Sequence, residues 1–488
     1  MCRACFETDA EPARLHFCHC GTPETQAAMR RIEADISRRQ LVGGMSAVVG
    51  MFAAFGLAPR QVRAQAQAPA RPLLLTNLRL FDGMALSIRE GVEILVEGGA
   101  IAALPAAGQG PEDAERIDCG GRTVIPGLID THWHATLASV SQIAAMTQDI
   151  GFVHLMAGRE AQATLMRGFT TVRDVGGPAF GLQAAIDRGV VEGPRIFPSG
   201  AMISQTSGHG DFRFSNALPM MPSDPADYAM RQGMTAIADG VPEALRRTRE
   251  QLMKGASQIK ITAGGGVASQ YDPLDSTQFT EAEMRAVVEA AEDWGTYVCA
   301  HVYTSKGIQR CIRAGVRSIE HGQLADEETV RMMADHGTWW SIQPFLADED
   351  ANQYADPKAQ AGQRMVAEGT VRAFELAQAH GVDWAFGTDI LYGGGESQGR
   401  QLAKLARFMS PLEALYRATG AAGELLALSG PRAPYDGRLG VIAEGALADL
   451  LVVEGDPEAD LSWLADTGNL RLIVKNGRIH KDSLRGGE

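Results

Sequence analysis

The chain has 488 residues, of which 45% are hydrophobic and 21% are charged. These proportions are typical of globular proteins and exclude a disordered or fibrous chain. The net charge of −14 argues against a nucleic-acid-binding surface, because no stripe of lysine and arginine is available to neutralise phosphates. We therefore expect a small-molecule partner and no nucleic acid.

Residues 1–66 are predicted to be an N-terminal region with an export signal. Paired arginines lie in Ser37–Leu41, a short apolar stretch covers 41–57, and Ala64–Ala66 offers a small-residue cleavage site. This order is typical of a twin-arginine signal peptide. The alternative is a membrane anchor, but about 17 residues are marginal for crossing a bilayer, and glycines interrupt them at Gly43, Gly44, Gly50 and Gly56. We expect a mature protein that begins near Gln67, is periplasmic or secreted, and has no stable membrane insertion.

Cysteine and histidine residues cluster before this signal, at Cys2, Cys5, His16, Cys18, His19 and Cys20. Such ligands could hold zinc, but the spacing matches no zinc module, and cleavage of the signal would remove the cluster. The mature region keeps Cys119, Cys299 and Cys311. Their apolar surroundings predict buried free thiols and no disulfide framework.

The two ends of the mature chain are rich in short β-like runs. These runs cover 73–77 and 92–97 near one end, and 448–453 and 472–477 near the other. We expect residues 67–123 and 430–488 to form one small, discontinuous β-sandwich domain.

Residues 124–429 repeat a different unit, in which an apolar strand is followed by a polar loop and an amphipathic helix. Helical spacing is clear in Glu281–Trp294 and Lys306–Ala314. Eight strands alternating with helices predict a (β/α)8 TIM barrel, in which catalytic residues lie at the C-terminal ends of the strands. The expected strands are Val124–Thr131, Thr170–Arg173, Arg195–Ser199, Gln258–Thr262, Tyr297–His301, Ser318–His321, Trp339–Gln343 and Asp383–Thr388.

Polar residues at the ends of these strands predict a metal site. His132 and His134 end the first strand with i, i+2 spacing, so both imidazoles point the same way. His301, His321 and Asp389 follow the ends of later strands in the same manner. Any one of them could be an ordinary polar residue at a barrel rim, but their occurrence in one barrel order favours a shared site.

Lys260 lies among apolar residues within a strand. Burial there lowers the pKa of the lysine and favours the neutral amine, which can take up carbon dioxide as a carbamate. The alternative is a lysine that extends from an edge strand into solvent.

Together, these residues resemble the metal-dependent amidohydrolase superfamily, in the imidazolonepropionase-like branch that includes Xaa-Pro and Xaa-Arg dipeptidases and ochratoxinase. The resemblance covers about residues 71–480. It is also carried by Thr206–Asp211, by Asp272–Gln278, by Ala300–Tyr303 and by Leu439–Leu450.

The resemblance implies two divalent metal ions, most simply zinc by ligand type. One ion would be held by His132, His134 and Asp389, and the other by His301 and His321, with Lys260 as a bridging N6-carboxylysine. It also implies a metal-bridged hydroxide as nucleophile, with Asp389 as general base and acid.

Two further residues are candidates for substrate contact. His209, in a glycine-rich loop, could polarise the scissile carbonyl, or it could only brace that loop. Tyr303 lies two residues beyond His301 and could bind a substrate carboxylate, or it could be a core tyrosine. The loop Tyr392–Gly399 lacks a histidine that relatives often have, which leaves substrate identity open. We assign no chemistry to His154, His336, His380 and His480.

The predicted function is hydrolysis of an amide bond in a dipeptide or N-acyl amino acid of Xaa-Pro or ochratoxin-like type. Imidazolonepropionase is a rival, but it resembles a mononuclear site without the strand lysine, so Lys260 counts against it. A cyclic amide or lactone hydrolase is a second alternative, and a non-catalytic assembly or binding protein a third, although such relatives typically lose metal ligands. Relatives are commonly homo-oligomers, and we expect the same here.

Overall fold

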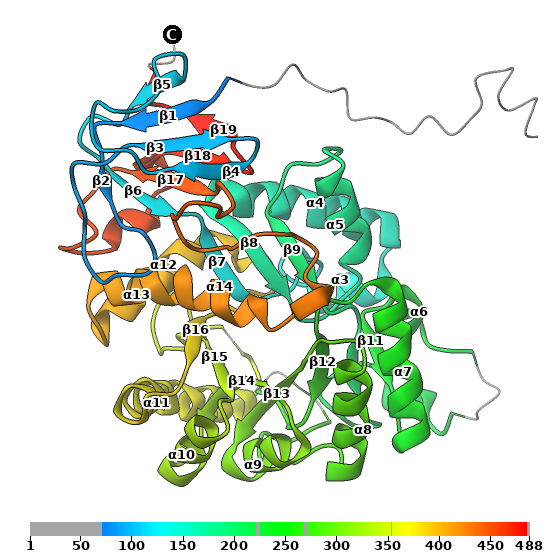
Figure 1. The fold of residues 1–488 in the computed structure, drawn as a ribbon. Coiled ribbons are helices and arrows are strands. Elements are labelled where there is room, and N and C mark those ends of the chain that lie inside the picture. The colour runs from blue at the N-terminus through cyan, green and yellow to red at the C-terminus, as the bar shows by residue number, and fades with distance from the viewer. Residues whose placement is uncertain (1–70, 221–224, 268, 270, 353, 486–488) are drawn as a thin grey trace, which may run out of the picture. The chain divides into compact units, whose positions relative to one another are not determined.

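The middle of the chain forms two parallel sheets (Figure 1). The computed structural model describes residues 71–220, 225–267, 269, 271–352 and 354–485, so the expected export signal and the N-terminal cysteine cluster lie outside the described residues. Three strands form the first sheet, in the order β7 (Leu128–Trp133), β8 (Phe169–Asp174) and β9 (Arg195–Pro198). Seven strands form the second, in the order β11 (Thr235–Ile237), β10 (Met202–Ser204), β12 (Ile259–Thr262), β13 (Val298–Thr304), β14 (Ser318–Leu324), β15 (Trp339–Ile342) and β16 (Trp384–Phe386).

Helices follow these strands and lie on their outer side (Figure 1). In α8, Met284, Val287 and Ala291 bury one helical stripe, and a capping box between Thr280 and Glu283 fixes where the helix begins. The expected helices 281–294 and 306–314 agree with α8 and α9 within two residues at each end. The main helices are α4 (Ile150–Met166), α5 (Phe180–Asp187), α7 (Val241–Lys254), α8 (Glu281–Glu292), α9 (Ser305–Ala314), α10 (Glu327–Asp335), α11 (Pro357–His380), α12 (Gln398–Lys404), α13 (Pro411–Arg417) and α14 (Gly420–Ala427).

The expected closed barrel is not one continuous ladder in the described residues, because the strands separate into the two sheets. Between β9 and β10 the chain turns at Gly200, whose φ is +75° and favours glycine. There the N–H of Ala201 donates to the side chain of Gln251, 3.1 Å away, and not to a strand. The expected third strand is therefore continued by β10 after a break.

Side chains join the other two sheet edges, β7 and β16. Oδ1 of Asp130 accepts the backbone N–H of Thr388 at 3.0 Å, and the Thr131 hydroxyl donates to the carbonyl of Phe386 at 2.9 Å. These side-chain bonds satisfy backbone N–H and C=O groups that would otherwise pair between β7 and β16 as in a continuous sheet. β7 and β16 are thus neighbours without being partners in one sheet.

The expected first strand, Val124–Thr131, is in fact two strands. Residues of β6 (Thr123–Pro126) pair with β17 (Leu450–Val453) in a different sheet, and β7 begins only at Leu128. The break falls at Gly127, where a Cβ atom would lie 2.0 Å from the hydroxyl oxygen of Thr170. Both strands are buried, so the apolar pattern of the sequence continues through the break. The pattern therefore could not reveal where one strand ends and the next begins.

Both ends of the described chain build a β-rich part with two sheets. One sheet has the order β4 (Ala100–Ala103), β3 (Ile94–Glu97), β1 (Leu73–Thr76) and β5 (Glu115–Asp118). The other has the order β19 (Arg478–Asp482), β18 (Leu470–Lys475), β17, β6 and β2 (Arg79–Leu80). The two sheets share an apolar core that includes Leu75, Ile94, Val124, Leu450 and Leu472.

This β-rich part and the strand and helix region belong to one unit, Arg71–Glu488. A buried ion pair joins them, with Nε of Arg195 on β9 lying 3.1 Å from Oδ2 of Asp449. Among the described helices, none combines the length and the apolar character that crossing a membrane requires.

Candidate metal centre

The polar residues at the strand ends converge on one site. His132 and His134 lie on β7 and at its end, His301 lies within β13, and His321 lies within β14. Asp389 follows β16, and its backbone N–H donates to the carbonyl of His132 at 2.8 Å. All of these side chains are buried or nearly so.

Three of these residues form a group that could hold a metal ion. One ligand atom each from His132, His134 and Asp389 lies within 4.8 Å of the other two. Oδ1 of Asp389 is 3.5 Å from Nε2 of His132 and 3.3 Å from Nε2 of His134. Two imidazoles and one carboxylate directed at a common point form a donor set that zinc accepts.

Hydrogen bonds leave the required nitrogen free on each of three histidines. Nδ1 of His134 lies 3.0 Å from the carbonyl of Gly176, which can only accept, so Nδ1 carries the proton. Nδ1 of His132 lies 2.8 Å from the Glu320 carboxylate. Nδ1 of His321 lies 2.9 Å from Oε1 of Gln343. Metal-binding histidines usually donate their other N–H in this way, which leaves Nε2 available.

His301 has the opposite orientation. Its Nε2 lies 3.2 Å from the carbonyl of Gly265, so Nδ1 is the nitrogen available to a ligand. The ring centroid of His301 is 4.5 Å from that of His321, which in turn is 4.7 Å from that of His132. His301 and His321 therefore lie directly beside the first group of ligands, although each strand continues three residues beyond its histidine and does not end there as expected.

The pKa values of three of the four histidines favour the neutral, ligating form. Burial lowers the pKa of His321 to about 3, although Asp389 opposes this shift. Burial and the Lys260 charge hold the pKa of His132 well below its usual range, and burial with His209 does the same for His301. Burial alone would also lower the pKa of His134, but Asp389 outweighs burial and raises that pKa. Burial alone would raise the pKa of Asp389, but His132 and the other imidazoles outweigh it and lower that pKa.

Lys260 occupies the centre of β12, and only 2% of its surface is exposed. Burial lowers its pKa, while Glu320, Cys299 and Asp389 oppose the shift. Among the described residues, its ammonium forms no ion pair within 4.0 Å. A buried amine with a lowered pKa and no paired carboxylate fits the neutral lysine that carbamate formation requires.

The backbone is strained at two of the candidate ligands. His321 has a φ of +74° and Asp389 a φ of +52°, in the left-handed region that residues with a Cβ atom rarely adopt. Such strain is found at functional sites, where the surrounding structure holds it in place.

His209 and Tyr303 flank the group. The His209 ring stacks on His301 with centroids 3.8 Å apart, and its Nδ1 lies 3.1 Å from Oδ2 of Asp272. The Tyr303 ring stacks on His321 at 4.9 Å. Both residues line a pocket that also contains His301 and Asp389.

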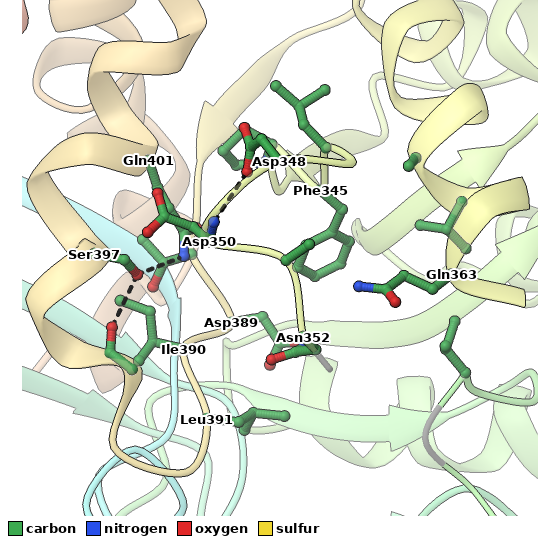
Figure 2. A pocket seen from close by; sticks show the side chains of 18 of the residues that line it. Phe345, Asp348, Asp350, Asn352, Gln363, Asp389, Ile390, Leu391, Ser397 and Gln401 are labelled. Carbon is green, nitrogen blue, oxygen red and sulfur yellow. Dashed lines mark hydrogen bonds between the residues drawn. The ribbon is translucent and has the colours of Figure 1, made fainter. Parts of the chain in front are cut away.

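This pocket extends from Asp389 toward the loop after β15 and toward α12. Figure 2 shows Asp389, Ile390 and Leu391 on one side and Phe345 and Gln363 on the other. The site thus has the concave, partly apolar surroundings that a small-molecule ligand requires.

Sequence reasoning did not single out several residues that support the ligands. Glu320 pairs with Arg173 at 2.7 Å while it contacts His132, and both residues of the pair are fully buried. Asp130 accepts the backbone N–H of His132 at 3.0 Å, and Gln343 holds His321. Glu320 and Asp130 lie beside a ligand or two residues from one, and Gln343 ends an expected strand, but each of these positions was only a weak signal.

The other histidines and the cysteines lie elsewhere. His154 is on α4, His336 follows α10, His380 ends α11 and His480 is on β19. None belongs to the metal-binding group found among the described residues. Cys119, Cys299 and Cys311 are buried free thiols, as expected.

The model of the Amidohydrolase family matches residues 123–480. The chain belongs to the amidohydrolase family. An ochratoxinase of Aspergillus niger is 34% identical over 373 residues, which are 73% of this chain and 75% of that protein. These matches show an enzyme that hydrolyses amide bonds.

Solved structures of other amidohydrolases are similar to this chain. A prolidase complexed with N-methylphosphonate-L-proline is 35% identical, with a TM-score of 0.78, and the match covers 84% of this chain and 100% of that one. A Xaa-Pro dipeptidase with bound methionine in its active site is 31% identical, with a TM-score of 0.72 and the same coverage. These neighbours imply the family's (β/α)8 barrel with an associated β domain, although in this chain the strand ladder is divided.

Proposed function

We propose that this amidohydrolase holds two divalent metal ions and cleaves dipeptides or N-acyl amino acids whose leaving amine carries a carboxylate. One observation carries the proposal: the free Nε2 atoms of His132 and His134 and the Asp389 carboxylate face one point, with His301 and His321 beside it. The similar ochratoxinase, prolidase and Xaa-Pro dipeptidase support the substrate class.

The donor set fits two ions. His132, His134 and Asp389 would hold one, and His301 through Nδ1 and His321 through Nε2 would hold the other. Lys260, as a carbamate, would supply a carboxylate between them. Bound ions of this kind supply a water molecule with a lowered pKa as the nucleophile.

The chain's own groups would handle the proton and the substrate. Asp389 is placed to accept the proton of the attacking water and to deliver it to the nitrogen of the leaving amine as the C–N bond breaks. In its protonated form, His209 donates through Nδ1 to Asp272 at 3.1 Å and through Nε2 to the carbonyl oxygen as negative charge develops there.

Recognition of the carboxylate falls to Tyr303, since both ring nitrogens of His209 are already assigned. Among the described residues that line the pocket, Lys404 is the one lysine or arginine, and its ammonium is already 2.7 Å from Asp348 and 2.7 Å from Asp350. A substrate carboxylate would therefore rely on the hydroxyl donor of Tyr303 near the metal ligands.

Turnover of a panel of dipeptides and N-acyl amino acids by the zinc-loaded protein tests this proposal. We expect cleavage of amides with a free carboxylate on the leaving amine, and no cleavage of the matching carboxamides. Cleavage of no carboxylate-bearing amide by protein that retains its zinc would overturn the substrate class. A native protein that binds no divalent ion would overturn the whole proposal.

A further inference from the structure

A buried carboxylate joins the two backbone segments that carry the first metal group. Asp130 is fully buried on β7. Its Oδ1 accepts the N–H of His132 and the N–H of Thr388, each at 3.0 Å, and its Oδ2 accepts the Thr388 hydroxyl at 2.5 Å. Because Thr388 immediately precedes Asp389, one side chain fixes the backbone at ligands from both strands.

The remaining donor to Asp130 is Gln398, the first residue of α12. Its Nε2 lies 2.9 Å from Oδ2 of Asp130. Its Oε1 accepts from Nε of Arg167 at 3.0 Å, and this bond fixes which end of the amide faces the carboxylate. Gln398 is fully buried, so neither bond can be replaced by bulk solvent at low cost.

The same relay contacts the loop that lines the pocket. Arg167 is bonded to Glu160 on α4, and Gly395 lies against this pair: a Cβ atom there would be 2.3 Å from Oε1 of Glu160. The loop 390–397 contributes Ile390, Leu391 and Ser397 to the pocket wall (Figure 2). A hydrogen-bonded chain of side chains thus supports the metal ligands, and the pocket loop packs against the far end of that chain at Glu160.

We propose that Gln398 is a positioning residue that couples the pocket loop 390–397 to the metal ligands His132 and Asp389 through Asp130. The inference rests on the proposed function for the presence of metal at these ligands. It goes further in assigning a role to residues that touch neither metal nor substrate: a change at Gly395, where the loop faces Glu160, alters the metal affinity, and so does a change at Gln398.

Zinc affinity, measured by chelator competition on the full chain, tests this role without relying on turnover. Gln398→Met keeps the length of the side chain and removes both hydrogen bonds. We expect zinc affinity to fall several-fold, less than the loss of about 10- to 100-fold that is typical of a group bonded directly to a metal ligand, because Gln398 acts through Asp130. The matched control is Gln309→Met, which removes a bond of similar type, from Gln309 to the Thr329 hydroxyl at 2.9 Å, away from the site.

Two neighbouring glycines separate coupling from simple loss of stability. Gly395→Ala pushes a methyl group against Glu160, whereas at Gly394 the nearest atom to a new Cβ is 3.6 Å away, an ordinary contact. We expect Gly395→Ala to weaken zinc binding several-fold and Gly394→Ala to leave the zinc affinity unchanged. Thermal unfolding of the zinc-free variants reports whether each still folds.

The outcomes distinguish this inference from the proposed function. If folded Gln398→Met and Gly395→Ala both bind zinc within twofold of the native protein, the coupling is wrong even if the enzyme cleaves its substrates. If zinc affinity falls as expected but no carboxylate-bearing amide is cleaved, the coupling stands and the proposed substrate class fails.

Discussion

Oε2 of Glu320 lies 2.8 Å from Nδ1 of His132, and the same carboxylate is held by the guanidinium of Arg173 at 2.7 Å and 2.8 Å. All three side chains are buried. The carboxylate therefore fixes the histidine's tautomer and directs its Nε2 toward the metal site, while the arginine compensates the buried charge.

Glu320→Gln should weaken both metal binding and folding. The substitution leaves Arg173 without its buried counter-charge, which typically costs about 3 to 5 kcal/mol of stability. It also removes the carboxylate that holds the His132 ring in place, so the zinc affinity of the protein should fall about 10- to 100-fold. Chemical denaturation and chelator competition measure the two effects. Glu281→Gln, which alters an exposed pair with Arg313 and Arg285, is the control and should change neither; equal behaviour of both variants would contradict the assignment.

Asp389 offers a test that separates chemistry from backbone strain. Asp389→Asn should reduce kcat by at least about 10²- to 10⁴-fold, because it removes the general base and a proposed metal ligand. The loss of stability should be small, because asparagine tolerates the left-handed φ of +52°. Asp389→Ala should lose similar activity and about 1 to 2 kcal/mol more stability. Kinetics and thermal unfolding of the two variants give the comparison, and equal stability would argue against strain at this residue.

Lys260→Met should reduce the metal content from two ions to one without unfolding the protein. Methionine keeps most of the volume, and the ammonium has no ion-pair partner among the described residues to leave behind. Metal analysis of the purified protein measures the stoichiometry, and the intact mass under native conditions reports the carbon dioxide adduct. Two ions retained in the variant, or no adduct in the native protein, would remove Lys260 from the site.

Tyr303→Phe should raise KM about tenfold for substrates with a carboxylate and leave kcat little changed, because one hydrogen bond to a charged group is worth about 1.5 to 3 kcal/mol.

His209→Asn should instead lower kcat, since the N–H donor of His209 acts on charge that develops in the transition state. Steady-state kinetics on matched acid and carboxamide substrates tests both. A KM effect that is the same for acid and carboxamide would contradict the role of Tyr303.

Lys475 should make a contribution to stability that rises with pH in the alkaline range. Burial lowers the pKa of Lys475 to about 8, with Arg195 adding to the shift, whereas the unfolded chain titrates near its usual 10.5. Between these values the unfolded state binds more protons, so the free energy of unfolding increases with pH by up to about 1.4 kcal/mol per pH unit from this group. Below pH 8 both states are protonated, and the contribution is constant.

Lys475→Met isolates that contribution. Urea unfolding of the native protein and the variant between pH 7 and pH 10 should give curves whose difference changes with pH only above about 8. Lys481 lies on the neighbouring strand and is less deeply buried. It provides the matched control Lys481→Met, for which we expect a weaker pH dependence. Parallel curves for the native protein and Lys475→Met would contradict the lowered pKa.

The sequence determined the candidate ligands because each lies at a fixed place in a local pattern. The i, i+2 spacing of His132 and His134 on one strand, and a polar residue after an apolar run at His301, His321 and Asp389, follow from strand geometry alone. The alternation of strands and helices and the β-rich ends are equally local signals.

The tertiary structure alone decided which distant groups support those ligands. Glu320 reaches His132 across 188 positions of sequence, and Gln398 reaches Asp130 across 268. Hydrophobic periodicity reports burial, but not the partner of a buried polar group, because that partner is set by how strands and helices pack. For the same reason the break at Gly127 and the divided ladder between β9 and β10 depend on close contacts with Thr170 and Gln251, which no pattern along the chain records.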